Sequence, residues 1–370
     1  MKGYLVFSMK YQANTETQKG LLLSADLQEK LIYRSGTFYR CVAGKEPQAV
    51  CKVPASARER LCIRFRLMER LLRYEPRFGI RMENGSYLVS WNGGLFCLNT
   101  ESRSFQKIFP YRNGMHNPLS ITKATAVPGF RDGFLFGDYW GNSSMEAVSL
   151  YYCDGVTVET VYTFPAGTVR HIHGLTADPK RERILIFTGD DDAESGIWEA
   201  KDGFRSVKPL LIGSQKYRSC AVYPLEDGLL YATDTPLCDN FIYFYDEKTK
   251  QLSTAYPLNG PCIYSEMTES PDGERFYLFA TSVEPDSRRK GLSYVLSYRL
   301  GDGVHSRYAT LVYGNPEKGF HEILRRKKDI FPMVPFQFGN FRLPHSEDGR
   351  IYAAGQSVAR LDGKTICIKR

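Results

Sequence analysis

Two histidines and a run of aspartates stand out as residues whose types and spacing could do chemistry. His171 and His173 alternate in the segment VRHIHG, and the segment TGDDDAES, which contains Asp190 and Asp191, follows one short turn later. Alternate residues of a strand point to the same side, so the two imidazoles should lie together. They could bind a divalent metal with a carboxylate, or act as acid and base. A third interpretation is that the two histidines form hydrogen bonds across the interior of the fold.

The elements that must position these residues form a repeat. Seven short apolar runs, most of them preceded by a turn of Asp, Gly, Asn or Pro, begin at residues 31, 87, 134, 184, 229, 276 and 351. Their spacing is 45 to 56 residues, apart from 75 before the last run, which is close to the period of four-stranded propeller blades. The 24 Tyr and 22 Phe also favour strands. The sequence therefore predicts an all-β fold, a seven-bladed β-propeller that uses residues 1–370 as a single domain.

Two segments interrupt the repeat with apolar residues at helical spacing, and we expect each to be a short helical insertion between blades. The first covers about residues 57–75 and contains Leu61, Phe65, Met68 and Leu72. The second covers about residues 316–329 and contains Phe320, Ile323 and Leu324. The terminal segments YLVFSM (4–9) and TICIKR (365–370) both look like strands. We expect one of them to complete a blade begun at the other end of the chain.

The propeller architecture sorts the polar residues onto one face. If each apolar run is the second strand of its blade, the end of that strand lies on the same face as the start of the innermost strand. Aromatic platforms mixed with amide, carboxylate and guanidinium groups on this face suit a sugar. The predicted catalytic residues are His171, His173, Tyr217, Arg218, Tyr264 and Glu266. The predicted substrate-binding residues are Trp91, Asp138, Trp140, Asp190, Asp191, Gln215, Asp234, Asn240, Phe338 and Asn340.

The region around blade four resembles the sialidase-like propellers with BNR (Asp-box) repeats. The resemblance rests on HIHGLTADPKRERILIFTGDDDAESGIWEAKDGF, followed by GSQKYRSCAVYPLEDGLLYATDTP and NFIYFYD. Within it, AKDGFRSV (200–207) is similar to an Asp-box that keeps its Asp and Gly but lacks the first Ser and the Trp. The resemblance implies a carbohydrate-active protein. A sialidase would use an arginine triad and a Tyr/Glu pair, for which the candidates are Arg34, Arg218, Arg342, Tyr264 and Glu266.

A second, weaker resemblance is to seven-bladed polysaccharide lyases that act on uronate-containing polymers, such as ulvan lyases. It implies β-elimination, in which a His or Tyr base removes the proton alpha to the carboxylate and an Arg or metal neutralises that carboxylate. His171, His173, Tyr217 and Arg218 supply these residue types. The predicted function is binding and cleavage of an acidic glycan, containing uronate or sialate, by lyase or glycosidase chemistry. The alternative is a non-catalytic propeller that binds a glycan or a protein.

Composition and missing motifs bear on the other classes of partner and function. The net charge of +8 is spread along the chain without a nucleic-acid motif, so we expect an acidic oligo- or polysaccharide as partner and no nucleic acid. Motifs of serine hydrolases and nucleotide sites, GxSxG, the P-loop and GxGxxG, do not occur. No pattern requires a cofactor, but a divalent metal near His171 and His173 stays open.

The cysteines and the first residues bear on the compartment. The nine cysteines have no CxxC spacing and indicate buried free thiols in a reducing environment. The first residues are too weakly apolar for a signal peptide or a membrane span. We therefore expect a cytoplasmic monomer without membrane contact, although an exported chain that had lost its leader would look the same.

Overall fold

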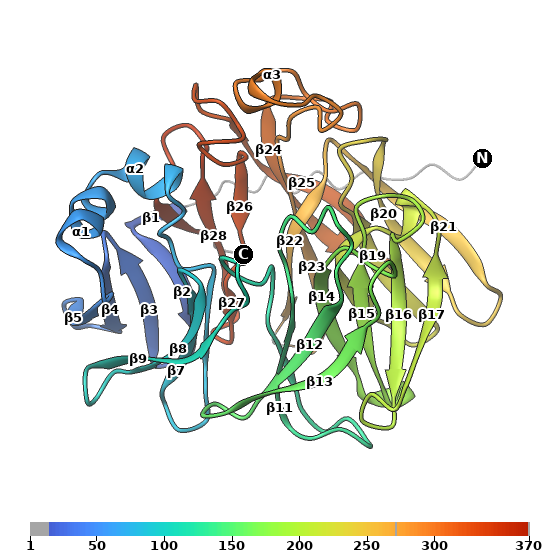
Figure 1. The fold of residues 1–370 in the computed structure, drawn as a ribbon, viewed down its shortest axis with the longest axis horizontal. Coiled ribbons are helices and arrows are strands. Elements are labelled where there is room, and N and C mark those ends of the chain that lie inside the picture. The colour runs from blue at the N-terminus through green and yellow to red at the C-terminus, as the bar shows by residue number, and fades with distance from the viewer. Residues whose placement is uncertain (1–14, 271, 369–370) are drawn as a thin grey trace.

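The computed structural model describes residues 15–270 and 272–368, and these form seven β-sheets arranged as a propeller (Figure 1). Each of the seven apolar runs forms the second strand of one sheet. The predicted seven-bladed all-β fold is therefore confirmed. From the centre outwards, blade one consists of β2 (Leu21–Ala25), β3 (Glu29–Arg34), β4 (Thr37–Val42) and β5 (Gln48–Lys52). Blade two consists of β6 (Phe78–Arg81), β7 (Tyr87–Trp91), β8 (Gly94–Asn99) and β9 (Ser104–Pro110). Blade three consists of β10 (Thr122–Ala124), β11 (Gly133–Gly137), β12 (Val148–Cys153) and β13 (Val158–Phe164).

The remaining blades have the same order of strands. Blade four consists of β14 (Ile172–Asp178), β15 (Arg183–Thr188), β16 (Gly196–Lys201) and β17 (Ser206–Ile212). Blade five consists of β18 (Ser219–Pro224), β19 (Gly228–Thr233), β20 (Asn240–Asp246) and β21 (Gln251–Leu258). Blade six consists of β22 (Cys262–Glu269), β23 (Arg275–Thr281), β24 (Tyr308–Asn315) and β25 (Gly319–Lys327). Blade seven consists of β26 (Asn340–Arg342), β28 (Ile351–Gln356), β29 (Lys364–Ile368) and β1 (Thr15–Lys19). The short strand β27 (His345–Ser346) pairs in parallel with β2 of blade one.

The two ends of the described chain meet in blade seven. β1 pairs antiparallel with β29, with Thr15 opposite Ile368 and Lys19 opposite Lys364. Residues 364–368 supply the third strand of this blade, and residues 15–19 supply the fourth. A strand from one end of the described chain therefore completes a blade begun at the other end, but it is residues 15–19 rather than either expected segment. The described part of TICIKR, residues 365–368, belongs to a blade begun at its own end, and YLVFSM (4–9) lies outside the described residues.

The core lies between neighbouring blades. The second strands β7, β15, β19 and β28 are buried along their whole length, because another blade covers each of their faces. The outermost strand β21 is largely exposed, and the residues of β9 are all half-buried or exposed. One apolar cluster, for example, joins Leu278 and Leu311 of blade six to Phe341 and Ile351 of blade seven. This packing fixes the innermost strands, which carry the candidate site.

The first predicted helical insertion is confirmed. Residues 57–75 contain α1 (Ala57–Arg64) and α2 (Arg66–Leu71), and Ser56 begins α1 with a capping box that it shares with Glu59. Leu61 and Phe65 of the expected apolar stripe are 59% and 57% exposed. Arg70, in contrast, is 1% exposed. The helices are therefore held by buried charge as much as by apolar contact.

The second predicted helix is wrong. Residues 319–327 form β25, the outermost strand of blade six. Phe320 and Leu324 are both buried, and a separation of four residues places two side chains on one face in a strand as well as in a helix. A register shift beside Ile323 disguises the alternation further. The short helix α3 (Leu292–Val295) lies instead between β23 and β24 of the same blade.

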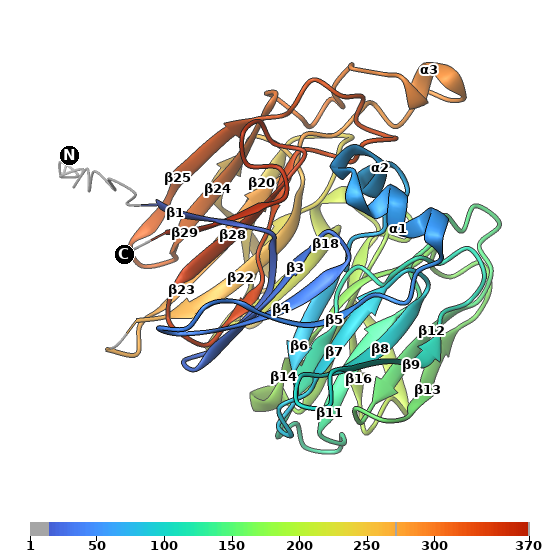
Figure 2. The same cartoon turned by 90° about the vertical axis from the view of Figure 1, so that its left-hand side faces the viewer.

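All three α-helices lie on one side of the propeller (Figure 2). The turn DPKRER of blade four lies at the far end of β14 and contains the short helix η1 (Pro179–Arg181). Its Arg183 is buried and contacts Asp178, Glu199 and Glu247 at 2.7–3.0 Å. As the repeat predicted, this turn has a structural role.

The nine cysteines are all free thiols, as predicted. The expectation that they are buried holds for four of them, whereas four are half-buried and Cys238 is exposed. None of the helices among the described residues is both long and apolar enough to cross a bilayer.

Candidate functional site

The site is built on residues that precede the innermost strands. Arg77, His171 and Arg218 each come directly before the first residue of β6, β14 and β18. These positions lie at the centre of the propeller, where the innermost strands converge. The ends of the second strands lie on the same face and supply acidic residues. These are Asp138 after β11, Asp190 after β15, Asp234 after β19 and Glu284 after β23.

The two histidines of blade four face each other, as the alternation predicted. Their Nε2 atoms are 3.1 Å apart. His171 Nδ1 lies 3.0 Å from the carbonyl oxygen of Trp140, and His173 Nδ1 lies 3.3 Å from that of Ser219. Because a carbonyl oxygen only accepts hydrogen bonds, both Nδ1 atoms carry a proton. In their neutral forms, the two rings therefore direct the lone pairs of their Nε2 atoms at each other.

Asp190 completes this group from the GDDD loop. Its two carboxylate oxygens lie 3.5 Å from the Nε2 atoms of His171 and His173. Arg218 donates to Asp190 Oδ1 at 2.8 Å and to the Asp190 carbonyl oxygen at 2.9 Å. Although burial alone would raise it, the Arg218 guanidinium and the His171 imidazole hold the pKa of Asp190 well below its usual range. The predicted convergence of HIH and GDDD is therefore present in the structure.

The neighbouring aspartate of the loop has a different role. The Asp191 side chain is 66% exposed and forms an ion pair with Arg170. Its carbonyl oxygen accepts a hydrogen bond from the Ser195 backbone at 2.9 Å, which closes the loop. Gln215, in the short helix η2 (Gln215–Tyr217), is buried and donates to the Asp190 carbonyl oxygen at 2.9 Å. Asp191 and Gln215 thus hold the loop in the position that turns Asp190 inward.

Blades five and six add buried acidic groups beside Arg218. The Cys220 thiol donates to Asp234 Oδ2 at 3.1 Å. Glu284 is 7% exposed and accepts a hydrogen bond from the Ser282 hydroxyl. Burial and the nearby Asp234 carboxylate raise the pKa of Glu284 to about 8. At neutral pH, a carboxyl group with this pKa holds its proton but can exchange it readily.

Two tyrosines flank the histidine pair. The ring of Tyr139 lies 4.6 Å from that of His171, and burial raises the pKa of Tyr139, which therefore keeps its proton at neutral pH. Tyr294 comes from α3, and burial and the nearby Glu284 raise its pKa. The same phenol also interacts with Arg73, which follows α2. Both helical segments therefore reach the rim of the site.

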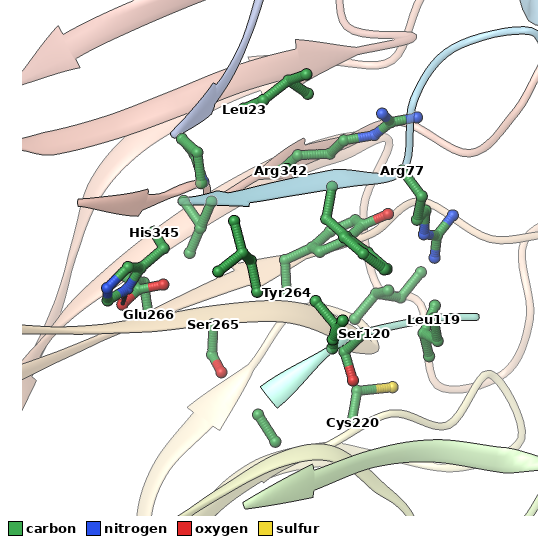
Figure 3. Close-up of a pocket in the computed structure, with 18 of the residues that line it drawn as sticks. Leu23, Arg77, Leu119, Ser120, Cys220, Tyr264, Ser265, Glu266, Arg342 and His345 are labelled. Carbon is green, nitrogen blue, oxygen red and sulfur yellow. Dashed lines mark hydrogen bonds and ion pairs between the residues drawn. The ribbon is translucent and has the colours of Figure 1, made fainter. Parts of the chain in front are cut away.

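A cavity of about 180 Å³ lies between the innermost strands, next to His173. Figure 3 shows Arg77 and Arg342 at one end of this channel and the pair of Glu266 and His345 at the other. The Arg77 guanidinium lies over the ring of Tyr264, 5.3 Å from its centre. Its Nε atom and the Tyr264 hydroxyl are both buried without a hydrogen-bond partner.

Arg77 has no acidic partner among the described residues, in contrast to Arg218 and Arg342. Arg218 is paired with Asp190, and Arg342 contacts Glu75 at 3.3 Å. The expectation that Arg218 neutralises a bound carboxylate is therefore not supported by its contacts. Arg77 is the guanidinium that is free to contact an anion in the channel.

The Tyr264 and Glu266 pair is divided along the channel. Glu266 Oε1 accepts a hydrogen bond from His345 Nδ1 at 3.3 Å, at the end away from Arg77. That hydrogen bond raises the pKa of His345. Tyr217 lies in η2 next to Tyr231, half-buried. The structure therefore gathers His171, His173 and Arg218 into one cluster, with Tyr264 in the adjoining channel.

Several predicted substrate-binding residues are part of the core. Trp91 is 3% exposed, and its Nε1 donates to the Tyr74 carbonyl oxygen at 2.6 Å. Asn240 is fully buried, and both ends of its amide bind the backbone of the 235–238 loop. Phe338 packs against the core of blades six and seven. These three side chains were expected on the open face and are placed by packing instead.

The remaining predicted residues lie near the site but are engaged by the protein. Asp138 is buried and accepts hydrogen bonds from Ser149 at 2.9 Å and Tyr151 at 3.2 Å. The half-buried Trp140 lies under the guanidinium of Arg112, 3.8 Å from the ring centre. Asn340 is buried, and its Oδ1 atom has no hydrogen-bond partner among the described residues.

Three residues of the site, Arg77, Glu284 and Tyr139, are absent from the site residues that the sequence predicted. Arg77 has a signal, because RFGIR (77–81) aligns with HIHGL and RSCAV at the start of the innermost strand. Glu284 comes three residues after β23, whereas Asp190 and Asp234 follow their strands by two residues and one. Its side chain reaches the same place through a longer loop, and the repeat alone does not show this.

Comparison with known proteins identifies the architecture. Neither a protein-family model nor a curated protein sequence matches this chain. A chain of the mitotic checkpoint complex is similar over 100% of this chain and 95% of its own length, with a TM-score of 0.56 and 11% identity. The WD40 β-propeller domain of Doa1 is similar over 98% of both chains, with a TM-score of 0.53 and 11% identity. The AfRom2 CNH domain is similar over 96% of both chains, with a TM-score of 0.52 and 11% identity.

The fold is that of a β-propeller. At this level of identity, the similarities carry no information about substrate or partner. The expected sialidase-like and lyase relationships stay predictions, and the function has to be argued from the site itself.

Proposed function

We propose that this propeller binds an acidic saccharide at the mouth of its central channel and cleaves it by β-elimination. The observation that carries the proposal is the unpaired Arg77 guanidinium beside the cluster of His171, His173 and Asp190. A guanidinium without an acidic partner suits a carboxylate, which it can bind with two parallel hydrogen bonds. The tyrosine rings near it offer flat surfaces for a sugar.

The residues around the mouth match the requirements of an elimination. A base takes the proton from the carbon alpha to the carboxylate, its electrons form a carbon–carbon double bond, and the bond to the leaving oxygen breaks. The leaving oxygen then takes a proton from an acid. We assign the base to the ionised form of Glu284, which a pKa of about 8 makes a minor but strongly basic species at neutral pH, and the acid to Tyr139, whose pKa is raised by burial. Arg77 and a positive charge shared by the histidine pair would stabilise the intermediate carbanion.

The geometry favours elimination over sialidase-type hydrolysis. A sialidase would need Tyr264 and a carboxylate together at the reacting carbon. Here Glu266 forms its hydrogen bond with His345 at the far end of the channel. The proposal is therefore a lyase, with the non-catalytic glycan-binding propeller as the alternative that the test must separate.

The test is incubation of the purified protein with polyuronate and sialylated oligosaccharides. A lyase produces a new double bond conjugated to the carboxylate, which ultraviolet absorbance and mass spectrometry detect. Sugar release without this double bond would contradict elimination. Binding without any product would support the non-catalytic alternative. The absence of both binding and product would refute the proposal.

Two variants locate the chemistry. Arg77→Ala should raise the KM by about 10- to 100-fold, because a hydrogen bond to a charged group contributes about 1.5–3 kcal/mol. Glu284→Gln should lower the kcat by at least about 100-fold if Glu284 is the base. Arg325→Ala is the control, since Arg325 is exposed on β25, the outermost strand of blade six. Equal activity of all three variants would rule out these assignments.

A further inference from the structure

The convergence of three acceptor groups in blade four needs a cation. The Nε2 atoms of His171 and His173 are 3.1 Å apart, and each lies 3.5 Å from an oxygen of Asp190. Both imidazoles have their Nδ1 proton committed to a backbone carbonyl oxygen. Two lone pairs and a carboxylate at these distances repel one another unless a positive charge lies between them.

We propose that His171 Nε2, His173 Nε2 and the Asp190 carboxylate bind one divalent transition-metal ion of the Zn²⁺ and Mn²⁺ class. Imidazole favours these ions over Mg²⁺ and Ca²⁺, which prefer oxygen ligands. Two His and one carboxylate leave at least one coordination position open, as in catalytic metal sites. The metal site rests on the contacts of these three residues and does not depend on the proposed saccharide chemistry.

The distances agree with a shared metal ion. Ligand atoms about 2.0–2.1 Å from a tetrahedral Zn²⁺ lie about 3.3–3.4 Å from one another, and neighbouring ligands of an octahedral ion lie about 3.0 Å apart. The two Nε2 atoms are 3.1 Å apart, which lies between these values, and the 3.5 Å from His171 Nε2 to Asp190 Oδ2 is slightly longer than the tetrahedral value. The possible ligand atoms of the three residues all lie within 4.8 Å of one another, so small side-chain shifts would bring them around one ion.

The surrounding groups orient the three ligands as the outer partners of metal sites do. The carbonyl oxygens of Trp140 and Ser219 fix both imidazoles with Nε2 pointing inward. Arg218 donates to Asp190 Oδ1, which leaves Oδ2 for the ion. His171, His173 and Asp190 come from the start of β14 and the end of β15, two strands that pair directly. The site is thus preorganised by one rigid hairpin.

A second group of possible ligands, His173, Cys220 and Asp234, shares one of these histidines. Its members are satisfied without a metal, since the Cys220 thiol donates to Asp234 at 3.1 Å. The Nε2 of His173 faces His171, which places the ion in the first group. The proposal therefore commits to His171, His173 and Asp190.

An ion at this position would also serve the reaction proposed above, although the experiment that tests for the ion contains no saccharide. His173 lines the central channel together with Arg77, so an ion beside it would be close to an anion bound there. It would supply the positive charge that the elimination needs on the substrate carboxylate. Metal binding without lyase activity would refute the lyase alone, and lyase activity in a protein that binds neither Zn²⁺ nor Mn²⁺ would refute the metal site alone.

The experiment is calorimetric titration of EDTA-treated, dialysed protein with Zn²⁺, Mn²⁺ and, as a negative control, Ca²⁺. We expect one equivalent of Zn²⁺ or Mn²⁺ to bind, and binding should raise the Tm because only the folded state presents the site. His171→Asn and Asp190→Asn should each lower the affinity by at least about 100-fold, since even the loss of an outer partner typically costs about 10- to 100-fold.

The matched control is His305→Asn. His305 Nε2 lies 3.0 Å from Asp239 Oδ1 in an exposed pair that lacks a third ligand, so its loss should leave the affinity unchanged. If the site variants do not fold, Co²⁺ bound to the wild-type protein gives the second measurement. Its visible absorbance and the paramagnetic shift of two imidazole Nδ1 protons report the two histidine ligands. Wild-type protein that binds neither Zn²⁺ nor Mn²⁺ would overturn the proposal and leave a shared proton as the cation.

Discussion

Two buried polar clusters on the helix side of this propeller differ in how their donors and acceptors match. Under α2, the Arg70 guanidinium donates to the Phe336 carbonyl oxygen, the Ser357 hydroxyl and the carboxylates of Asp329 and Asp362. In blade four, two imidazoles and a carboxylate present acceptors to one another. The first cluster holds the fold together without any ligand. The second would be balanced by the cation proposed above, and the following variants test whether this difference separates a structural cluster from a binding site.

The largest expected effect breaks the matched cluster. Arg70→Met removes the buried guanidinium from Asp329 and Asp362, which keep Lys328 and Arg66 as partners, and loss of several hydrogen bonds between charged groups should cost about 3 kcal/mol. Urea denaturation measures the free energy of unfolding. Arg58→Met, at an exposed position on α1, is the control and should change it by less than about 0.5 kcal/mol. A loss below about 1 kcal/mol in Arg70→Met would show that this cluster does not anchor the helices.

The next effect depends on pH and tests the acidic side of the second cluster. Because the pKa of Glu284 is raised to about 8 from an ordinary value of 4.5, the folded state holds a proton that the unfolded state releases between these values. Stability should therefore fall as the pH rises from about 4.5 to about 8, by at most about 1.4 kcal/mol per pH unit from this group.

Glu284→Gln removes this contribution. The free energy of unfolding of the variant, relative to that of the wild type, should increase steadily over this pH range and level off above it. Urea denaturation at several pH values measures the difference. A constant difference would mean that Glu284 has an ordinary pKa in the folded protein.

A smaller effect is expected from the mismatched cluster itself. His171→Asn removes one of the converging acceptors, so the free energy of unfolding of metal-free protein should change by no more than about 1 kcal/mol. The same urea denaturation, carried out in EDTA, gives the comparison with Arg70→Met. A loss as large as that of Arg70→Met would place the histidine pair among the structural contacts.

The smallest effect concerns an exposed arginine of blade six. Arg325 is exposed on β25 and pairs with Glu322 at 2.7 Å. Arg325→Ala should change the free energy of unfolding by less than about 0.5 kcal/mol, because solvent screens such a pair. A larger loss, measured by the same denaturation, would show that exposure does not distinguish Arg325 from the buried Arg70.

The sequence predicted the repeating strands of the fold but not which charged side chains are buried, as Arg70 and Arg325 illustrate. The repeat of apolar runs correctly predicted seven second strands, because their burial between blades requires continuous apolar sequence. Local spacing could not decide between helix and strand at Phe320 and Leu324, where only pairing with β24 determines the outcome. Nor could it show that Arg70 is buried, since its partners lie far away in the sequence.

The candidate site was predictable where the residues belong to one hairpin. His171, His173 and Asp190 were placed together from strand alternation and the position of the turn, and the structure brings them together. Trp91 and Asn240 were misjudged, because the sequence does not show that neighbouring elements cover them. The roles of Arg77 and Glu284 depend on which charges are already paired, and pairing is a property of the assembled propeller.

The pairing of β1 with β29 makes completion of the ring depend on the order of synthesis. The strand that closes blade seven is made before blades one to six, and its partner, residues 364–368, is made after them. Blades one to six can pack as they leave the ribosome, but β1 must wait with an unpaired edge until residues 364–368 have been made. Such an edge can pair with other chains. The nascent protein is therefore exposed to misassembly until these residues leave the ribosome, and the ring closes only afterwards.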